Sequence, residues 1–126
     1  MQRFIGKKIL LGVSGGIAAY KSIELARLLQ QEGALVQVIM TKSAQDFVGP
    51  QSFQAVTGQP VWFDVNDSAF EQSMAHIELS RWADVMLIAP ATANVMAKLA
   101  YGLTDDLLSL VAMMMTKPIM VCPAMN

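Results

Sequence analysis

Cysteine, histidine and charged residues are all scarce in this sequence of 126 residues. The single cysteine, Cys122, excludes an internal disulfide and a cysteine-rich zinc site, and it suits a reducing compartment. Charged residues make up 15% of the chain and the net charge is −1, so no basic surface is available for nucleic acid. We therefore expect a cytoplasmic protein with no metal site and no nucleic-acid partner.

A hydrophobic run long enough to cross a membrane is also missing. Residues 107–125 are nearly all apolar, but Lys117 and Pro118 divide them into a helix-length piece and a strand-length piece. We expect a buried helix and a buried strand there, and no membrane partner. Apolar residues still make up 54% of the chain, which is high for one domain of this size. Part of its surface is therefore expected to be covered by other copies of the chain.

Strand-like and helix-like segments alternate along the sequence, which predicts one α/β domain with a parallel sheet over residues 1–126. Continuous apolar runs such as KILLGV indicate strands buried on both faces. We predict strands over residues 8–13, 35–40, 61–63, 84–90 and 118–125. Helices are predicted over residues 17–31, 51–58, 76–83, 91–102 and 105–115, with a short helix starting at Ser43. The polar stretch 64–74 is predicted to be a loop.

Four segments should meet at one edge of this sheet, because the carboxyl ends of parallel strands lie together and bind ligands there. They are SGGI after the first strand, TKS after the second, APATAN after the buried strand at 84–90, and CPAMN at the end. The sequence thus predicts the position of a ligand site before it predicts the ligand.

The first of these segments, within GVSGGIAAYKS at 12–22, resembles a nucleotide loop but matches neither common type. A Walker loop requires a glycine directly before the lysine, and Tyr20 occupies that position. A dinucleotide fingerprint requires G-x-G-x-x-G, whereas the spacing here is G-x-x-G-G. The remaining pattern is a strand, a glycine turn and a helix start, which attracts an anion.

Residues of two neighbouring turns can surround one phosphate group, and a mononucleotide such as FMN would present it. The residues are Ser14, Gly15 and Gly16 in the first turn, and Thr41 and Ser43 in the second. On the residues alone, two tight turns that bind no ligand remain an equally open interpretation.

Motifs that follow the glycine loop in the sequence resemble those of a known protein family. HIELSRWADVMLIAPATANVMAKLAYGLTDDLLS at 76–109 and PAMN at 123–126 resemble the homo-oligomeric flavin-containing cysteine decarboxylases. GVSGGIAAYKS and TKSAQDF are similar to the same family, so the resemblance covers nearly the whole chain. It implies a Rossmann-like, flavodoxin-like three-layer sandwich with a parallel sheet.

The resemblance also implies roles for particular residues. The glycine loop and Ser43 would hold the phosphate of FMN, and the isoalloxazine ring would contact Pro90, Thr92, Ala93, Asn94 and Val95. His76, the only histidine, matches the family's active-site base, and Asn126 matches the residue that binds the substrate carboxylate. Each of these roles has a purely structural alternative. Thr92 or Asn94 can cap a helix, His76 can be a surface residue, and Asn126 can be a solvated residue at the end of the sequence.

Within the family, the branch that acts in coenzyme A biosynthesis fits best. The resemblance implies FMN-dependent decarboxylation of 4′-phosphopantothenoyl-L-cysteine to 4′-phosphopantetheine, through transient oxidation of the cysteine moiety to a thioaldehyde. It implies a homotrimer or a dodecamer built from trimers, and a fused ligase domain. The substrate flap with its cysteine would follow Asn126, so we expect the sequence to be part of a longer protein. A peptidyl-cysteine decarboxylase and a non-catalytic flavin-binding regulatory subunit are the alternatives.

Overall fold

The fold is known from a computed structural model, which describes residues 2–64 and 69–124, with side chains described for these residues except 69–73. The strands are β1 (Lys8–Val13), β2 (Leu35–Met40), β3 (Val85–Ala91) and β4 (Ile119–Pro123). The α-helices are α1 (Lys21–Gln31), α2 (Pro50–Thr57), α3 (Ala69–Trp82), α4 (Ala93–Tyr101) and α5 (Leu107–Met114). Two short 3-10 helices are η1 (Ile17–Tyr20) and η2 (Ser43–Asp46).

The strands form one parallel sheet in the order β2-β1-β3-β4. The chain moves outward from β1 to β2 and then crosses back to place β3 on the other side of β1. Val13 pairs with Met40, and Gly12 pairs with Ile88, so the three strands finish at the same edge. Strand order reverses between β1 and β3, which is where such sheets bind ligands. The predicted parallel α/β fold is confirmed.

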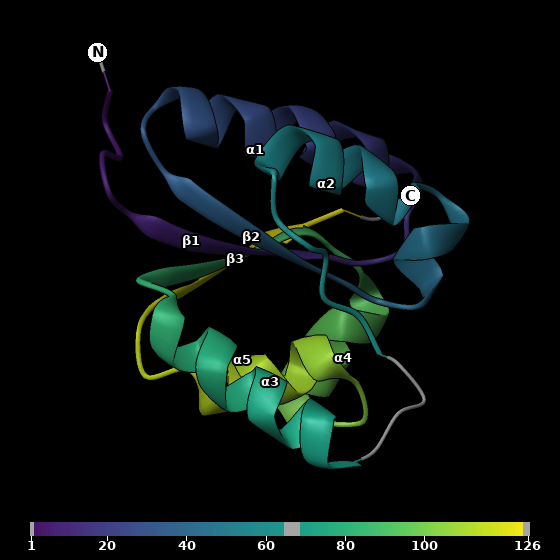
Figure 1. Cartoon of the computed structure of the whole chain (residues 1–126). Coiled ribbons are helices and arrows are strands. Elements are labelled where there is room, and N and C mark those ends of the chain that lie inside the picture. Colours follow the sequence, from purple (N-terminus) through teal and green to yellow (C-terminus); the bar gives the residue numbers. More distant parts are fainter. Residues whose placement is uncertain (1, 65–68, 125–126) are drawn as a thin grey trace.

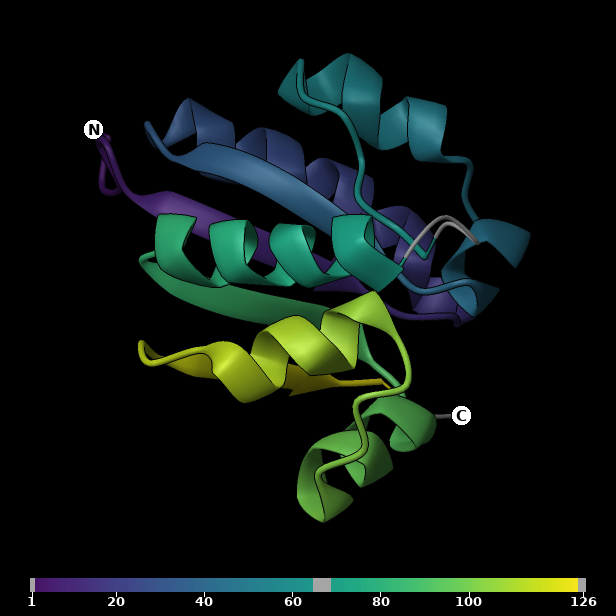
Figure 2. The same ribbon diagram turned by 60° about the horizontal axis from the view of Figure 1, so that its bottom comes forward.

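Helices cover both faces of the sheet, as Figure 1 shows. Alternation along β1 divides its side chains: Leu11 and Val13 face one core, and Leu10 faces the other. The first core contains Ala26 of α1 and Phe53 of α2 and lies under those helices. The second core is covered by α3 and α5, which lie side by side on that face (Figure 2), with α4 beyond the ends of the strands. This is the expected three-layer sandwich.

Helix ends follow the glycine pattern of the sequence. Gly58 and Gly102 end α2 and α4 with left-handed backbone angles, φ of 69° and 70°, which glycine adopts without steric cost. The predicted helix over 17–31 is present, but its first turn is the 3-10 helix η1 and α1 proper begins at Lys21. The tighter turn brings the chain out of β1 and into the helix layer within four residues.

Three sequence predictions were wrong in part. The strand expected to be buried after Pro118 is β4, and four of its five residues are exposed. Residues 61–63 do not form a regular strand; Trp62 makes one isolated parallel bridge to Ile39 at the open edge of β2. The segment 64–74 is not all loop, because α3 already begins at Ala69. Its residues 69–74, AFEQSM, include alanine, glutamate, glutamine and methionine, which favour helix even without a clear apolar stripe. Within the described residues, no helix has the length and apolar character needed to span a bilayer.

Candidate functional site

Ser14 joins the ends of β1 and β3 beneath the predicted ligand edge. Its side chain is fully buried, its hydroxyl donates to the carbonyl oxygen of Pro90 at 2.5 Å, and the N–H of Thr92 donates to that hydroxyl at 3.0 Å. The Ser14 N–H also donates to the Pro90 oxygen at 3.3 Å. Its hydroxyl and N–H are therefore used within the protein, where they fix the loops that surround the candidate site. A contact between Ser14 and a phosphate stays a prediction.

Gly15 and Ser43 bring the first two turns into direct contact. A Cβ added to Gly15 would lie 2.3 Å from the Ser43 hydroxyl oxygen and 2.8 Å from the Ser43 carbonyl carbon. Only glycine fits this approach, which is the reason for a glycine here, since its φ lies outside the left-handed region. A Cβ on Gly16 would meet only Thr92 Cγ2, at 3.8 Å. The predicted convergence of the two turns is thus present in the structure.

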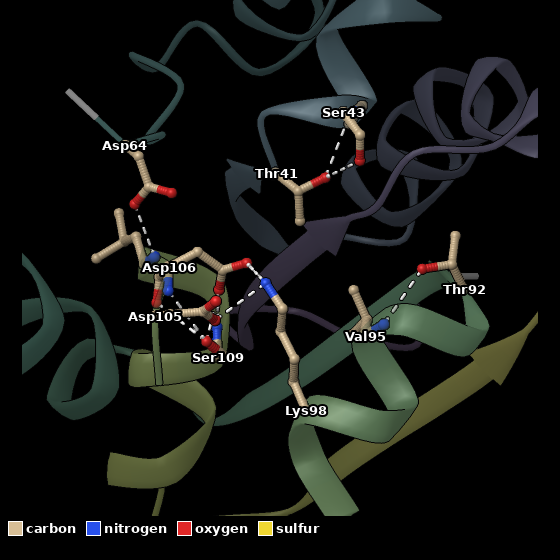
Figure 3. Close-up of polar contacts among 11 residues, drawn as sticks. Thr41, Ser43, Asp64, Thr92, Val95, Lys98, Asp105, Asp106 and Ser109 are labelled. Carbon is tan, nitrogen blue, oxygen red and sulfur yellow. Dashed lines mark hydrogen bonds and ion pairs between the residues drawn. The ribbon is translucent and has the colours of Figure 1, made fainter. Parts of the chain in front are cut away.

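Hydrogen bonds around Thr41 hold the second turn in place. The Thr41 N–H donates to the Val13 oxygen at 3.0 Å, and its side-chain oxygen accepts from the Ala44 N–H at 3.2 Å. The Thr41 and Ser43 hydroxyls lie 3.3 Å apart (Figure 3). Thr41 is buried, whereas Ser43 is exposed. Thr41 therefore shapes the turn, and Ser43 is free to present its hydroxyl to a ligand.

The start of α4 supplies the third turn. The Thr92 side chain caps the helix by accepting from the Val95 N–H at 3.3 Å, so the capping interpretation holds. Ala93 and Asn94 are exposed. Val95 is buried in the core under α3 and α5, although part of it reaches the cavity described next. Pro90 is buried and lines neither cavity in the described structure, so its contribution here is its carbonyl contact with Ser14.

Two cavities open at this edge and share Gly15 and Thr92. The larger, of about 540 Å³, is lined by Gly15, Thr41, Lys42, Ser43, Asp46, Asp64, Thr92, Asn94, Val95, Lys98 and Asp106. The smaller, of about 420 Å³, is lined by Gly15, Gly16, Ile17, Ala18, Tyr20, Lys21, Thr92 and Ala124. Both volumes suit a small organic ligand. Hydroxyl, amide and backbone N–H groups of three turns face one space, which suits a ligand rich in oxygen and nitrogen acceptors.

An ionic cluster forms the far wall of the larger cavity, opposite Ser43 (Figure 3). Lys98 of α4 donates to Asp105 at 3.0 Å and to Asp106 at 2.9 Å. Asp106 caps α5 by accepting from the Ser109 N–H at 2.8 Å, and Asp64 accepts from the Leu107 N–H at 2.8 Å. Burial opposes ionisation of Asp106, but hydrogen bonds from Ser109 and Lys98 outweigh it and lower its pKa. The Asp106 and Asp105 contacts raise the pKa of Lys98, so the cluster stays charged.

The two predicted catalytic residues are placed differently. His76 lies half-buried in the middle of α3, seven residues after its start, or about 10 Å along the helix at 1.5 Å per residue. It lines neither cavity in the described part of the chain. Asn126 lies outside the described residues. Ala124, two positions before it, lines the smaller cavity.

Several cavity residues were not predicted: Lys98, Asp106, Asp64 and Asp46 in the larger cavity, and Ala18, Tyr20 and Lys21 in the smaller. Lys42, Ile17 and Ala124 also line the cavities; they belong to the segments TKS, SGGI and CPAMN that were expected at this edge, but no contact was assigned to them. Asp106 and Ser109 carried a usable signal, since a polar pair three residues apart ahead of an apolar run is typical of a capped helix start. Lys98 carried none, because its partners are brought near it only by the packing of α4 against α5.

Comparison with known proteins identifies relatives of this chain. A family model described as Flavoprotein matches residues 3–126. The chain belongs to the flavoprotein family. It is 53% identical over 126 residues to the coenzyme A biosynthesis bifunctional protein CoaBC of Vibrio vulnificus strain YJ016, covering 100% of this chain and 31% of that protein. The chain therefore spans about a third of the length of such curated relatives.

Solved flavoprotein structures share the fold. The FMN-dependent cysteine decarboxylase SpaF is 32% identical with a TM-score of 0.84, covering 95% of this chain and 69% of SpaF. A PPC decarboxylase mutant complexed with pantothenoylaminoethenethiol is 34% identical with a TM-score of 0.80, covering 96% of this chain and 68% of that one. These matches confirm the resemblance stated from the motifs and the Rossmann-like, flavodoxin-like architecture.

Proposed function

We propose that this chain is the FMN-dependent decarboxylase part of a coenzyme A biosynthesis protein, acting on 4′-phosphopantothenoyl-L-cysteine. One observation carries the proposal: Gly15, Ser43, Thr92 and Asn94, from three separate turns, line a single cavity at the strand-order reversal. Relatives at 32–34% identity with this arrangement of strands are FMN-dependent cysteine decarboxylases or a PPC decarboxylase. The product would be 4′-phosphopantetheine.

The residues of the edge fit FMN. The contact between Gly15 and Ser43 leaves no room for a side chain, so backbone and hydroxyl can approach a phosphate closely. Thr92, Ala93 and Asn94 present a hydroxyl, exposed backbone and an amide, which match the donors and acceptors on the polar edge of an isoalloxazine ring. Gly16 and Val95 would complete the contacts. In this assignment Ser14 and Pro90 support the site from below, whereas the largely buried Thr41 lines the cavity beside Ser43.

FMN would supply a reversible two-electron oxidation of the cysteine moiety, which provides the electron sink that loss of CO₂ requires. The chain's own residues would do the rest. The Asn126 amide would donate to the substrate carboxylate and orient it without adding a fixed positive charge that opposes its departure. His76 would act as the base in the early steps, accepting a proton from the substrate.

A second copy of the chain would complete the site. His76 lies on α3 and lines neither cavity, so we propose that it serves a cavity shared with a neighbouring subunit in a homotrimer, which can assemble further into a dodecamer. Large apolar side chains support such burial: Leu103, Met113 and Met120 are 53%, 54% and 60% exposed. Leu103 follows the end of α4, Met113 lies on α5, and Met120 lies on β4, at one end of the strand order. Covering them would remove an apolar surface that is unfavourable in water.

The complete protein would have a second activity. The curated relatives are described as bifunctional, and this chain matches about 31% of the Vibrio vulnificus protein. We propose that residues 1–126 belong to the decarboxylating part and that a ligase domain is the fused partner. A small-molecule substrate, a low charge and the single free Cys122 suit a cytoplasmic enzyme.

Mass spectrometry of the products tests this function. The full-length protein is incubated with phosphopantothenoylcysteine, and a separate reaction contains a peptide with a C-terminal cysteine. We expect loss of CO₂ from the first substrate and formation of 4′-phosphopantetheine. Turnover of the peptide alone would assign the peptidyl-cysteine activity instead, and flavin binding without turnover of either substrate would indicate a regulatory subunit.

A further inference from the structure

The helix α4 and its capping residue place two side chains at the larger cavity, but few buried side chains hold the helix in place. Thr92 caps the helix and Asn94 lies in its first turn. Val95 is its one fully buried residue, and Met96 and Leu99 are only partly buried. Its first turn is tied to β1 by the bond from the Thr92 N–H to the Ser14 hydroxyl, 3.0 Å long. A nine-residue helix with one buried side chain needs a second attachment to keep its direction.

The Lys98–Asp106 contact is that second attachment. Lys98 lies one turn beyond Val95 and reaches across to the residue that begins α5. Both side chains are shielded, with 16% of Lys98 and 13% of Asp106 exposed, unlike the surface pair Arg27–Glu24 at 52% and 53%. Shielding strengthens the attraction between the charges and makes either one costly without the other.

The start of α5 is itself fixed from two sides. The Asp106 carboxylate accepts from the N–H and the hydroxyl of Ser109, at 2.8 and 2.6 Å, and Asp64 accepts from the Leu107 N–H. Leu107, Leu108 and Val111 then anchor α5 in the core. Hydrogen bonds thus fix Asp106 at the start of α5, and Lys98 connects α4 to it. Lys98, Asp106 and Asp64 all line the cavity that Thr92 and Asn94 line.

We propose that Lys98 and Asp106 form a positioning pair that sets the direction of α4, and with it the placement of Thr92 and Asn94 against the cofactor. The inference rests on the proposed function, because it names FMN as the ligand whose orientation is set. The pair acts through the helix and is needed for affinity and for a single orientation of the ring, with no role assigned to it in proton transfer.

Three substitutions separate this role from simple stability. Lys98→Met removes the charge and keeps most of the length, whereas Lys98→Arg keeps the charge. Asp106→Asn removes the charge but keeps a good helix cap, since asparagine caps helices as well as aspartate. Arg27→Met breaks the exposed pair on α1 and serves as the control. For each protein, the FMN dissociation constant, the visible circular dichroism of bound FMN and the melting temperature without FMN are measured.

We expect Lys98→Met and Asp106→Asn each to weaken FMN binding about tenfold and to change the flavin dichroism, because each breaks the shielded contact between α4 and the start of α5. The double variant should be no worse than either single one, since both break the same interaction. Lys98→Arg should restore affinity to within about twofold, and Arg27→Met should match the wild type. Lower melting temperatures with unchanged affinity and dichroism would overturn the proposal, as would additive losses in the double variant. Absence of FMN binding by the wild type would instead refute the proposed function.

Discussion

Replacing Gly15 with alanine places a methyl group inside the contact between the two turns that build the larger cavity. The new Cβ would lie 2.3 Å from the Ser43 hydroxyl oxygen, 2.7 Å from its Cβ and 2.8 Å from its carbonyl carbon. A rotation of the Ser43 side chain moves its hydroxyl and relieves the first contact, but it moves neither Cβ nor the carbonyl carbon. Ordinary contact begins at 3.4 Å, so the start of η2 must retreat by about 0.7 Å, the difference between 3.4 Å and the 2.7 Å distance to Cβ.

That retreat has a cost that can be estimated. The start of η2 is held by the bonds from Thr41 to Val13 and from Ala44 to Thr41, and both must lengthen. Overpacking of this kind costs about 1–3 kcal/mol of stability. If the displaced Ser43 weakens the binding free energy of FMN by about 1.4 kcal/mol, the affinity for FMN falls about tenfold.

Gly16→Ala is the matched control. Its methyl group would meet only Thr92 Cγ2, at 3.8 Å, and its φ of −168° is extended backbone that alanine adopts freely. Both variants are measured by chemical denaturation and by fluorescence titration with FMN. We expect Gly15→Ala to lose stability and affinity, and Gly16→Ala, which controls for folding stability alone, to unfold like the wild type. Equal stability of the two variants, whether both harmless or both damaging, would refute the reasoning.

Four further predictions follow from the same geometry. Ser14→Ala leaves the Pro90 oxygen and Thr92 N–H without their buried partner and should lower the free energy of unfolding by about 2 kcal/mol, with the ratio of FMN to riboflavin affinity unchanged; a collapsed ratio would support the phosphate role of Ser14. Ser43→Asp should abolish FMN binding by repelling the phosphate, and normal binding would remove Ser43 from that contact. His76→Asn in the full-length protein should keep bound FMN and lose CO₂ release, whereas unchanged turnover would rule out a base at this position. Because the pKa of Asp106 is lowered in the fold, its ionised carboxylate stabilises the protein above the ordinary aspartate pKa of about 3.9, and this stabilisation is lost as the pH falls below that value. The loss of stability caused by Asp106→Asn should therefore be smaller at about pH 3 than at about pH 6. An equal loss at both pH values would contradict the pairing.

The strands β1, β2 and β3 were predictable because they are largely buried and therefore read as unbroken apolar runs, whereas the apolar run of β4 forms a strand that is largely exposed. KILLGV and LVQVIM match β1 and β2 residue for residue, and the glycines at 58 and 102 mark helix ends. The start of α3 was not predictable in this way, since residues 69–74 show helix propensity without an apolar stripe. The single bridge at Trp62 depends on where the chain passes the edge of β2, which no local pattern encodes.

The location of the candidate site was predictable, but the task of each residue was not. The order of strands alone brings the Gly15, Ser43 and Thr92 turns together. Burial separates residues that look equivalent in the sequence: Ser14 is buried and lines no part of the larger cavity, Thr41 is buried in its wall, and Ser43 and Asn94 are exposed in it. The contact of Lys98 with Asp105 and Asp106 arises from the packing of two helices, so neighbouring residues in the chain give no sign of it.

The most direct test of the central claim, that this edge holds FMN, is a titration of the purified chain with FMN and with riboflavin, followed by quenching of flavin fluorescence. The account predicts saturable binding of FMN that is clearly tighter than that of riboflavin, because the Gly15–Ser43 contact receives the phosphate. Absence of saturable binding, or equal affinity for the two flavins, would contradict it.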